Sequence, residues 1–186
     1  VEYIRKMNLY TKVAIAECYT RTGAKPIAVK WIDVNKGDAK EPNYRSRLVG
    51  KEFNTYQDAS MFAATPPLES LRTIIHLAAT IAHEHDMPMS IMTNGISRAY
   101  FYAPSKREIY IKIPPEDCFP GDEDKVGVLD FSLFGTRDAA QSWAKCYGEV
   151  LANAGFVKGA ASGCNLYHPK RDIAFTCHGD DFLVMG

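Results

Sequence analysis

Two adjacent acidic residues, Asp180 and Asp181, stand near the end of the sequence, between two apolar stretches. The apolar residues alternate on both sides, which predicts a β-hairpin over residues 173–185 with Gly179-Asp180 as a two-residue loop. Carboxylates are the hard oxygen ligands that Mg²⁺ prefers, and a protein usually supplies one or two of them. Two such ions about 4 Å apart can activate an attacking oxygen and stabilise the oxygen that leaves. The alternative is purely structural, because aspartate is also a favoured turn residue.

Hydrophobic periodicity predicts the elements that would position this hairpin. A first helix should open at Thr65, with Pro66 in its first turn, and continue along one apolar face to Ala82. A second helix should begin after Asp138 and end at Gly155. The order of elements indicates an α+β fold, with an antiparallel sheet and helices packed on one face. Besides the terminal hairpin, strands are expected over 27–34, 44–53, 89–93 and 108–113.

The composition is that of a folded protein without net charge. The 186 residues suit one domain, with room for two lobes, and 46% of them are hydrophobic. Lys+Arg and Asp+Glu both number 22, so the net charge gives no general argument for a polyanionic partner. Five widely spaced cysteines indicate reduced thiols, and no apolar run reaches the ~18 residues of a membrane span. We expect an intracellular location, cytoplasmic or nuclear, and ends that belong to a longer protein, because the chain starts at Val1.

Positive charge is concentrated in one stretch of the sequence. Residues 21–51 contain eight Lys or Arg residues against three Asp or Glu residues. Lys30 lies on the first arm of the hairpin that the first two strands would form, and Arg45 and Arg47 lie on the second arm. Lys and Arg donate charged hydrogen bonds to phosphate oxygens, so this hairpin could bind a phosphate-bearing ligand. A solvated hairpin face is the alternative.

Two other clusters are weaker candidates for metal binding. His83, His85 and Asp86 lie at the predicted end of the first helix, where residues two apart point to different sides. Cys177 and His178 are neighbours on a predicted strand, so their side chains should leave opposite faces. We expect neither cluster to bind a metal ion.

Six segments form a pattern that covers most of the chain, from about Lys25 to Gly186. They are Arg45-x-Arg47-Leu48-Val49-x-Lys51, Leu71-Arg72-Thr73-Ile74, Ile109-Tyr110-Ile111 with Pro114-Pro115, Ser132-Leu133-Phe134-Gly135-Thr136-Arg137-Asp138-Ala139-Ala140-Gln141-Ser142-Trp143, Gly155-Phe156 and Gly179-Asp180-Asp181. In this order and at these spacings, the segments resemble the reverse transcriptase of copia-type retrotransposons.

The resemblance implies a fold and a reaction. Residues 25–186 would form the fingers and part of the palm of a right-hand polymerase, ending before the thumb, and residues 1–24 would be a lead-in. The implied activity is RNA-directed DNA polymerisation, in which two Mg²⁺ ions assist the transfer of a nucleotide. The implied partners are primer–template nucleic acid and deoxynucleoside triphosphates, with integrase and ribonuclease H as neighbours in a retroelement polyprotein and no membrane.

The resemblance also assigns roles to individual residues. Asp180 and Asp181 correspond to the paired catalytic acids that bind the metal ions. Tyr100 would lie under the sugar of the nucleotide and exclude a 2′-hydroxyl, whereas without the resemblance it is a core aromatic residue. The nucleotide-binding residues would be Lys30, Arg45, Arg47 and Tyr100, and the template-contacting residues would be Arg137 and Gln141.

Two positions depart from the family pattern. The segment with the family's other catalytic carboxylate has the form Asp-Val-x-x-Ala-aromatic-hydrophobic, and here it is Gly95-Ile96-Ser97-Arg98-Ala99-Tyr100-Phe101. Gly95 thus replaces the first catalytic aspartate, and Gly179 stands where the family usually has valine. We expect weak or lost Mg²⁺ binding and an impaired or inactive polymerase, because a metal ligand and its charge are missing. The alternative is a non-catalytic nucleic-acid-binding or scaffold module that retains the fold.

Overall fold

The structure is a computed structural model that describes residues 1–53, 61, 63–85 and 89–186, with the side chains of residues 81–85 outside the description. The chain divides into two compact units. The first consists of Val1–Met61 and Tyr100–Trp143, and the second of Phe62–Ala99 and Ala144–Gly186. Both contain helices and antiparallel strands, which confirms the predicted α+β class.

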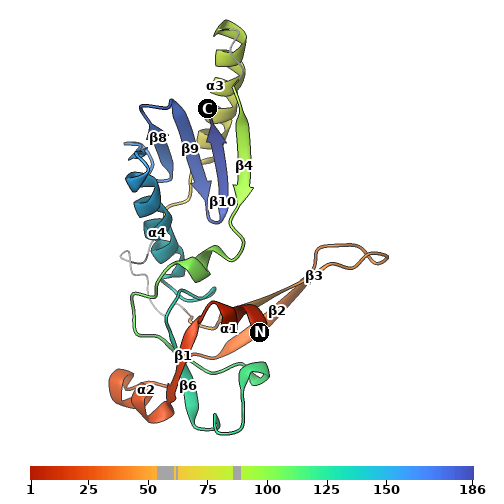
Figure 1. Ribbon diagram of the computed structural model, residues 1–186, viewed down its shortest axis with the longest axis vertical. Coiled ribbons are helices and arrows are strands. Elements are labelled where there is room, and N and C mark those ends of the chain that lie inside the picture. Colours follow the sequence, from red (N-terminus) through yellow and green to blue (C-terminus); the bar gives the residue numbers. More distant parts are fainter. Residues whose placement is uncertain (54–60, 62, 86–88) are drawn as a thin grey trace. The chain divides into compact units, whose positions relative to one another are not determined.

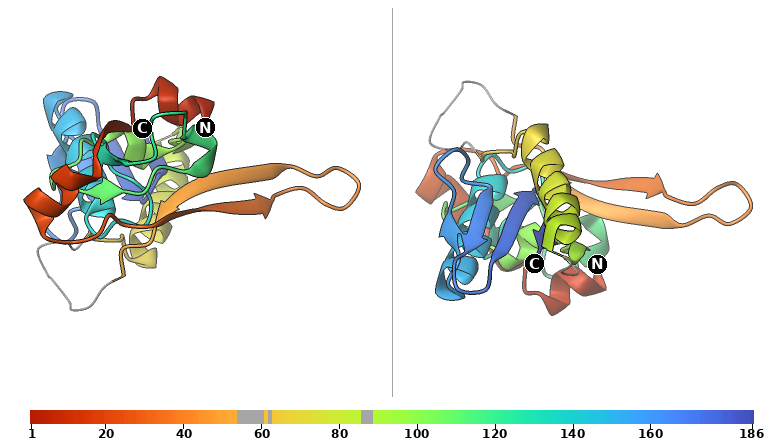
Figure 2. Two further views of the ribbon diagram at one scale, coloured as in Figure 1. Left: turned by 90° about the horizontal axis from the view of Figure 1, so that it is seen from below. Right: turned by 90° about the horizontal axis from the view of Figure 1, so that it is seen from above.

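The first unit contains a three-stranded antiparallel sheet and a separate two-stranded hairpin (Figure 1). In the sheet, Tyr10–Ala14 (β1) and Tyr110–Ile111 (β5) lie on either side of Lys125–Leu129 (β6). The hairpin pairs Val29–Asn35 (β2) with Tyr44–Gly50 (β3), as predicted, and its far end projects beyond the rest of the unit (Figure 2). The other elements are Glu2–Lys6 (α1), Ile15–Thr22 (α2) and the 3-10 helices Pro115–Asp117 (η3) and Ala99–Tyr102 (η2), the last of which begins in the second unit.

The core of this unit includes residues from the very start of the chain. Leu9 is fully buried in the same cluster as Leu48, Ile111 and Leu133. Ile4 of α1 belongs to this cluster as well. The expected lead-in of residues 1–24 therefore shares a hydrophobic core with later strands, while the boundary at residue 25 stays a prediction.

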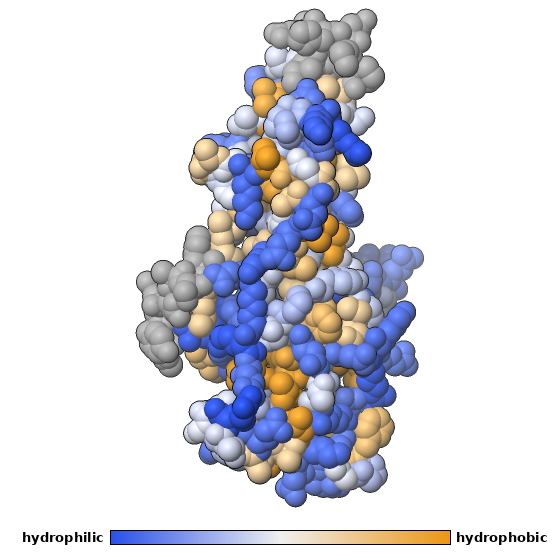
Figure 3. Space-filling view, turned by 60° about the vertical axis from the view of Figure 1, so that its left-hand side comes forward, coloured by the Kyte–Doolittle hydropathy of each residue, from blue (hydrophilic) through white to orange (hydrophobic). Residues whose placement is uncertain are grey.

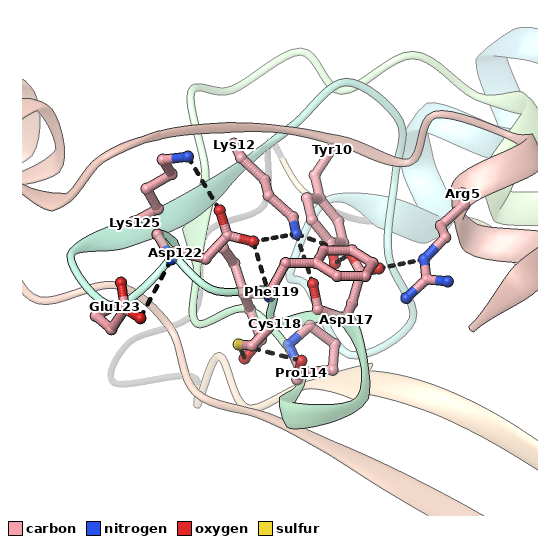
Figure 4. Close-up of polar contacts among 12 residues, drawn as sticks. Arg5, Tyr10, Lys12, Pro114, Asp117, Cys118, Phe119, Asp122, Glu123 and Lys125 are labelled. Carbon is pink, nitrogen blue, oxygen red and sulfur yellow. Dashed lines mark hydrogen bonds and ion pairs between the residues drawn. The ribbon is translucent and has the colours of Figure 1, made fainter.

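Two buried carboxylates connect β1 to the segment before β6 (Figure 4). Asp117 accepts hydrogen bonds from the Tyr10 hydroxyl and, at 2.5 Å, from Arg5 Nε. Lys12 Nζ donates to the Asp117 carbonyl at 2.5 Å and lies 2.6 Å from Asp122 Oδ2. Burial acts to raise the pKa of Asp117, but the hydrogen bonds and the charges of Lys12 and Arg5 lower it overall. Charged hydrogen bonds thus stabilise the folded N-terminal segment.

The second unit contains a five-stranded antiparallel sheet with the order β4-β10-β9-β8-β7 (Figure 1). The terminal hairpin predicted over 173–185 is confirmed as β9 and β10. The strands are Ile91–Gly95 (β4), Val157–Lys158 (β7), Asn165–His168 (β8), Ile173–His178 (β9) and Asp181–Met185 (β10), and the helices are Leu68–His85 (α3) and Ala139–Asn153 (α4), the latter beginning in the first unit.

Helices cover both faces of this sheet, so the prediction of helices on one face is wrong here. Successive residues of a strand point to opposite faces. Leu183 of β10 packs against Ile74 and Ala78 of α3. Phe182, the neighbour of Leu183, points to the opposite face, where its ring contacts that of Tyr147 in α4, with ring centroids 5.6 Å apart. The amphipathic pattern of a helix predicts that one of its sides is buried, but not which face of the sheet it covers.

The predicted helix ends are right for α4 and wrong for the start of α3. The helix α4 begins directly after Asp138, and Gly155 follows its end with a φ of +97°, as a helix-terminating glycine should. The helix α3 begins at Leu68, so Thr65 lies ahead of the helix and is not its N-cap. Two consecutive prolines delay the start, since the residue before a proline avoids the helical region.

Apolar side chains remain exposed in several places, as Figure 3 shows for one face of the molecule. The outer strand β4 is exposed throughout, with Ile91 44% and Met92 53% exposed. An exposed edge strand is a site at which other strands can pair. Among the described residues, no helix combines the length and apolar character that a membrane span requires.

The lowered pKa of Asp117 predicts acid sensitivity of the first unit. A carboxyl group with a lowered folded pKa stabilises the protein above its unfolded pKa of about 4, and this contribution is lost as pH falls through the folded pKa. The urea midpoint should therefore fall from about pH 5 to about pH 2, and it should fall less in Asp117→Asn. Circular dichroism at each pH measures this, with Asp33→Asn on exposed β2 as the control. Equal acid sensitivity in all three proteins would contradict the role of Asp117.

Candidate functional site

The two adjacent acids lie at the loop of the β9–β10 hairpin. Asp181 pairs with His178, so Gly179 and Asp180 are the two loop residues, as predicted. Gly179 has a φ of +64°, which the first loop residue of a type II′ turn requires and which glycine adopts without steric cost. Asp180 is half-buried and Asp181 is exposed. The local sequence therefore folds into a tight turn that places Asp180 in the loop and Asp181 at the first position of β10.

Gly95 lies directly opposite Asp181 across the β4–β10 pair. A Cβ atom built on Gly95 would be 3.1 Å from Asp181 Oδ1. Beyond the strand, the Ile96 N–H donates to the Asp180 carbonyl at 2.8 Å and extends the pairing to the acid loop. A side chain at position 95 would thus meet the carboxylate of Asp181, which would have to move by a few tenths of an ångström to make room.

A pocket of about 510 Å³ adjoins this pair of strands. Asp181, Gly95 and His178 line it from the sheet, in one row across three strands. Leu68 and Leu71, from the start of α3, form apolar walls. The pocket is therefore a concave, largely apolar site with one carboxylate and one imidazole at its edge, the kind of place where small ligands bind. Its other lining residues are Pro66, Pro67, Thr93, Asn94, Thr176, Phe182 and Leu183.

The donor set near the acids is small. Within the described ranges, no group of three or more His, Cys, Asp or Glu side chains is arranged to hold a metal ion. Cys177 is buried and pairs with Phe182, whereas His178 pairs with Asp181, so the two neighbours point to opposite faces as predicted. Burial raises the pKa of the Cys177 thiol to about 12, and the nearby carboxylates add to this effect. Without a bound ligand, the thiol is therefore protonated at neutral pH.

The cluster of His83, His85 and Asp86 lies outside the described side chains, so its expected lack of metal binding stays a prediction.

The basic residues of the β2–β3 hairpin share one face. The register pairs Lys30 with Val49, Arg47 with Ile32 and Arg45 with Val34. Cross-strand partners and alternate residues of a strand point to the same side, so all three cations are on this side. All three are exposed, and the face includes no acid within the two strands. The hairpin therefore presents a cationic surface, which we call the cationic face.

Tyr100 and Arg47 meet at a residue that the sequence analysis did not single out, Phe134. The Tyr100 and Phe134 ring centroids are 4.5 Å apart, and Arg47 Cζ is 5.6 Å from the Phe134 centroid. Both contacts are favourable, one between aromatic rings and one between a cation and a ring. Phe134 thus gathers two predicted nucleotide-binding residues. Its place in the segment 132–143, which carries the family resemblance, is the signal that could have identified it.

Arg137 and Gln141 lie at the start of α4 and are half-buried. The Arg137 N–H donates to Glu52 Oε2 at 2.8 Å. Glu52 in turn accepts two hydrogen bonds from Arg107, at 2.9 and 2.8 Å. Burial acts to raise the pKa of Glu52, but these donors lower it overall, so the group is a carboxylate at neutral pH. No sequence signal pointed to this pair, because the two residues are far apart in the chain.

The sequence profile of reverse transcriptases (RNA-dependent DNA polymerases) matches residues 16–186. With most of the chain matched, the protein belongs to the reverse transcriptase family, and the predicted copia-type resemblance is confirmed. It is also similar to the retrovirus-related Pol polyprotein from transposon TNT 1-94 of Nicotiana tabacum, with 24% identity over 194 residues. That alignment covers 100% of this chain and 14% of the polyprotein, so the chain spans a small part of that relative's length.

The backbone of Gly179 predicts a position that tolerates only glycine well. At a φ of +64°, alanine is strained although an added Cβ would touch nothing, so Gly179→Ala should lower the free energy of unfolding by about 1 kcal/mol. Gly163→Ala is the matched control. Its added Cβ would also have no atom within 4 Å, but its φ lies outside the left-handed region. The control should be neutral or slightly stabilising. Urea denaturation measures both, and equal effects would contradict the turn assignment.

Proposed function

We propose that this chain is the fingers and part of the palm of an RNA-directed DNA polymerase from a copia-type retrotransposon polyprotein. It binds primer–template nucleic acid but adds nucleotides weakly or not at all, because Gly95 replaces the first catalytic aspartate. The family match over residues 16–186 and the similarity to a transposon Pol polyprotein support the class of enzyme. Integrase and ribonuclease H would be its neighbours in such a polyprotein.

The position of Gly95 is the observation that carries the proposal. An aspartate there would extend from a Cβ that is 3.1 Å from Asp181 Oδ1, in the same row of the sheet. Three carboxylates would then gather at the acid loop, with Asp180 next in the chain. This is the arrangement that a pair of Mg²⁺ ions needs, since each ion requires oxygen ligands and the ions repel one another. With glycine, the set is one carboxylate short.

Mg²⁺ in a complete site would supply Lewis-acid activation of the primer hydroxyl and positive charge near the pyrophosphate. Among the described residues, no group of three or more His, Cys, Asp or Glu side chains is arranged to hold a metal ion, which supports the proposal of weak or lost Mg²⁺ binding. Removing a ligand from a catalytic metal site commonly raises the barrier by several kcal/mol, and each 1.36 kcal/mol is a factor of about ten in rate. The expected consequence is a reaction slower by about a hundredfold or more.

The binding functions rest on residues that the chain retains. Lys30, Arg45 and Arg47 on the cationic face have the charge and exposure to bind the triphosphate of a nucleotide. Tyr100, packed on Phe134, is held as a rigid aromatic surface for the sugar. Arg137 and Gln141 at the start of α4 would contact the template.

A second function, nucleic-acid binding without catalysis, is favoured by one specific observation. The cationic face combines three exposed cations with exposed aliphatic residues, and the one acid of the two strands, Asp33, lies on the opposite face, although the whole chain carries no net charge. Phosphate neutralisation alone gives affinity that falls steeply with salt. Such a module would bind nucleic acid as a polymerase does but would not add nucleotides.

The substitution Gly95→Asp tests the proposal. It should increase primer extension at least about a hundredfold over the unmodified chain, because it supplies the missing carboxylate. Gly95→Asn is the matched control, since its side chain has the same shape but no charge, and it should leave extension near the wild-type level. Extension of a labelled primer on an RNA template, with Mg²⁺ and deoxynucleotides, measures the effect.

Binding of the same primer–template, followed by fluorescence anisotropy, should be salt-dependent in all three proteins. Efficient extension by the unmodified chain would overturn the catalytic part of the proposal. The absence of salt-dependent binding by the unmodified chain would overturn the binding part.

A further inference from the structure

We propose that Arg107 is a positioning residue for nucleic-acid binding. By joining Glu52 to Asp138, it holds the turn before α4, with Arg137, in a fixed place relative to the end of β3. This inference rests on the proposed binding function. It assigns a role to a residue that touches neither nucleotide nor template, but acts through the groups that it orients.

The geometry around the guanidinium group is specific. Arg107 Nη1 donates to Glu52 Oε1 at 2.9 Å, and Nη2 donates to Glu52 Oε2 at 2.8 Å. The same Nη2 donates to Asp138 Oδ1 at 2.8 Å. Two parallel bonds to one carboxylate and a third to another use the planar fork of arginine, which the single ammonium of lysine cannot reproduce.

The carboxylate of Glu52 connects Arg107 to the turn before α4. Its Oε2 accepts the Arg137 N–H at 2.8 Å, so the backbone that carries Arg137 is bonded to the same group that Arg107 holds. A second bond joins the same two segments, from the Gly50 N–H to the Phe134 carbonyl at 2.7 Å. The end of β3 and residues 134–137 therefore form one rigid connection, with the cationic face on one side of it.

Burial and charge make the connection depend on Arg107. The side chains of Glu52 and Asp138 are 15% and 8% exposed, so two carboxylates lie close together away from water. Without the guanidinium they would repel each other, and Glu52 would have only the Arg137 N–H among the bonds described here. Arg107 Nη1 and Nη2 donate to these carboxylates, and Nε is buried without a hydrogen-bond partner among the described residues, so we assign Arg107 a positioning role and not a phosphate contact.

The substitution Arg107→Lys separates the two possible roles of this residue. It keeps the charge and removes the bidentate geometry. Binding of a fluorescent primer–template should weaken about fivefold or more, and the slope of log K against log salt should become shallower by about one contact, because Arg137 is no longer held in place. A phosphate contact made by Arg107 itself would leave the slope unchanged, since lysine supplies the same charge.

Arg21→Lys is the matched control. Arg21 also binds a glutamate, Glu108, at 2.9 Å in the first unit, but this pair is 61% and 41% exposed and touches no predicted site residue. It should change the affinity by less than about twofold. Thermal denaturation measures the folded fraction of each protein, so that each affinity can be calculated for the folded molecules only.

A second variant keeps the test valid where Arg107→Lys does not fold. Glu52→Gln preserves the shape and one hydrogen bond to Arg107, and it should reduce the salt slope in the same way. Wild-type affinity and slope in both variants would overturn the positioning role and leave the proposed function intact. An unmodified chain without salt-dependent binding would overturn both.

Discussion

The antiparallel pairing of β4 with β10 is the constraint on which the candidate site depends. It sets Gly95 opposite Asp181, and hydrogen bonds at both ends hold the register. At one end the Ile96 N–H donates to the Asp180 carbonyl, and at the other Ser90 and Gly186 exchange two backbone hydrogen bonds, at 2.8 and 3.1 Å. A slip of one residue would turn every side chain of β4 to the other face. Because the register is held, Asn94 pairs with Phe182, and Gly95 is the residue of β4 that lies opposite Asp181.

The consequence is a separation between binding and catalysis. Catalysis by two metal ions needs negative charge at one point, and in the proposed function Gly95 leaves such a site with two carboxylates where three are expected. Binding of a nucleic-acid backbone needs positive charge spread over a surface, and the cationic face retains Lys30, Arg45 and Arg47. The connection made by Arg107 and Glu52 concerns only the second property. Under the proposed function, the reaction depends on position 95 whereas binding depends on the cationic face, so a change at position 95 would affect the two properties separately.

Local features of the sequence predicted local structure well. The alternation over 173–185 and the glycine at position 179 predicted the hairpin that carries the two acids. The apolar runs bounded by turn residues predicted β2 and β3. Both predictions succeeded because a hairpin depends on residues that are neighbours in the sequence. The family segment predicted that Gly95 would lie near the acids, and the register places it there. The strands β1 and β6 were not predicted, since their short apolar runs are typical of several structures.

Features that join distant parts of the chain could not be predicted in the same way. Whether α3 and α4 cover the same face of the sheet depends on chain connections and packing, and hydrophobic periodicity gives no information about this. The carboxylates of Glu52 and Asp138 meet at Arg107 only because β3, a loop and the start of α4 converge. Charged residues that are far apart in the sequence form no recognisable sequence motif, so their contacts can be identified only in the folded structure.

Metal affinity tests the central claim most directly. Mn²⁺ can replace Mg²⁺ at carboxylate sites and is observed by electron paramagnetic resonance, so its binding can be titrated without any reaction. We expect Gly95→Asp to bind Mn²⁺ at least about tenfold more tightly than the unmodified chain, and we expect the addition of Asp181→Asn to remove this gain. Equal Mn²⁺ affinity in the unmodified chain and in Gly95→Asp would contradict the claim that the glycine leaves the site one carboxylate short.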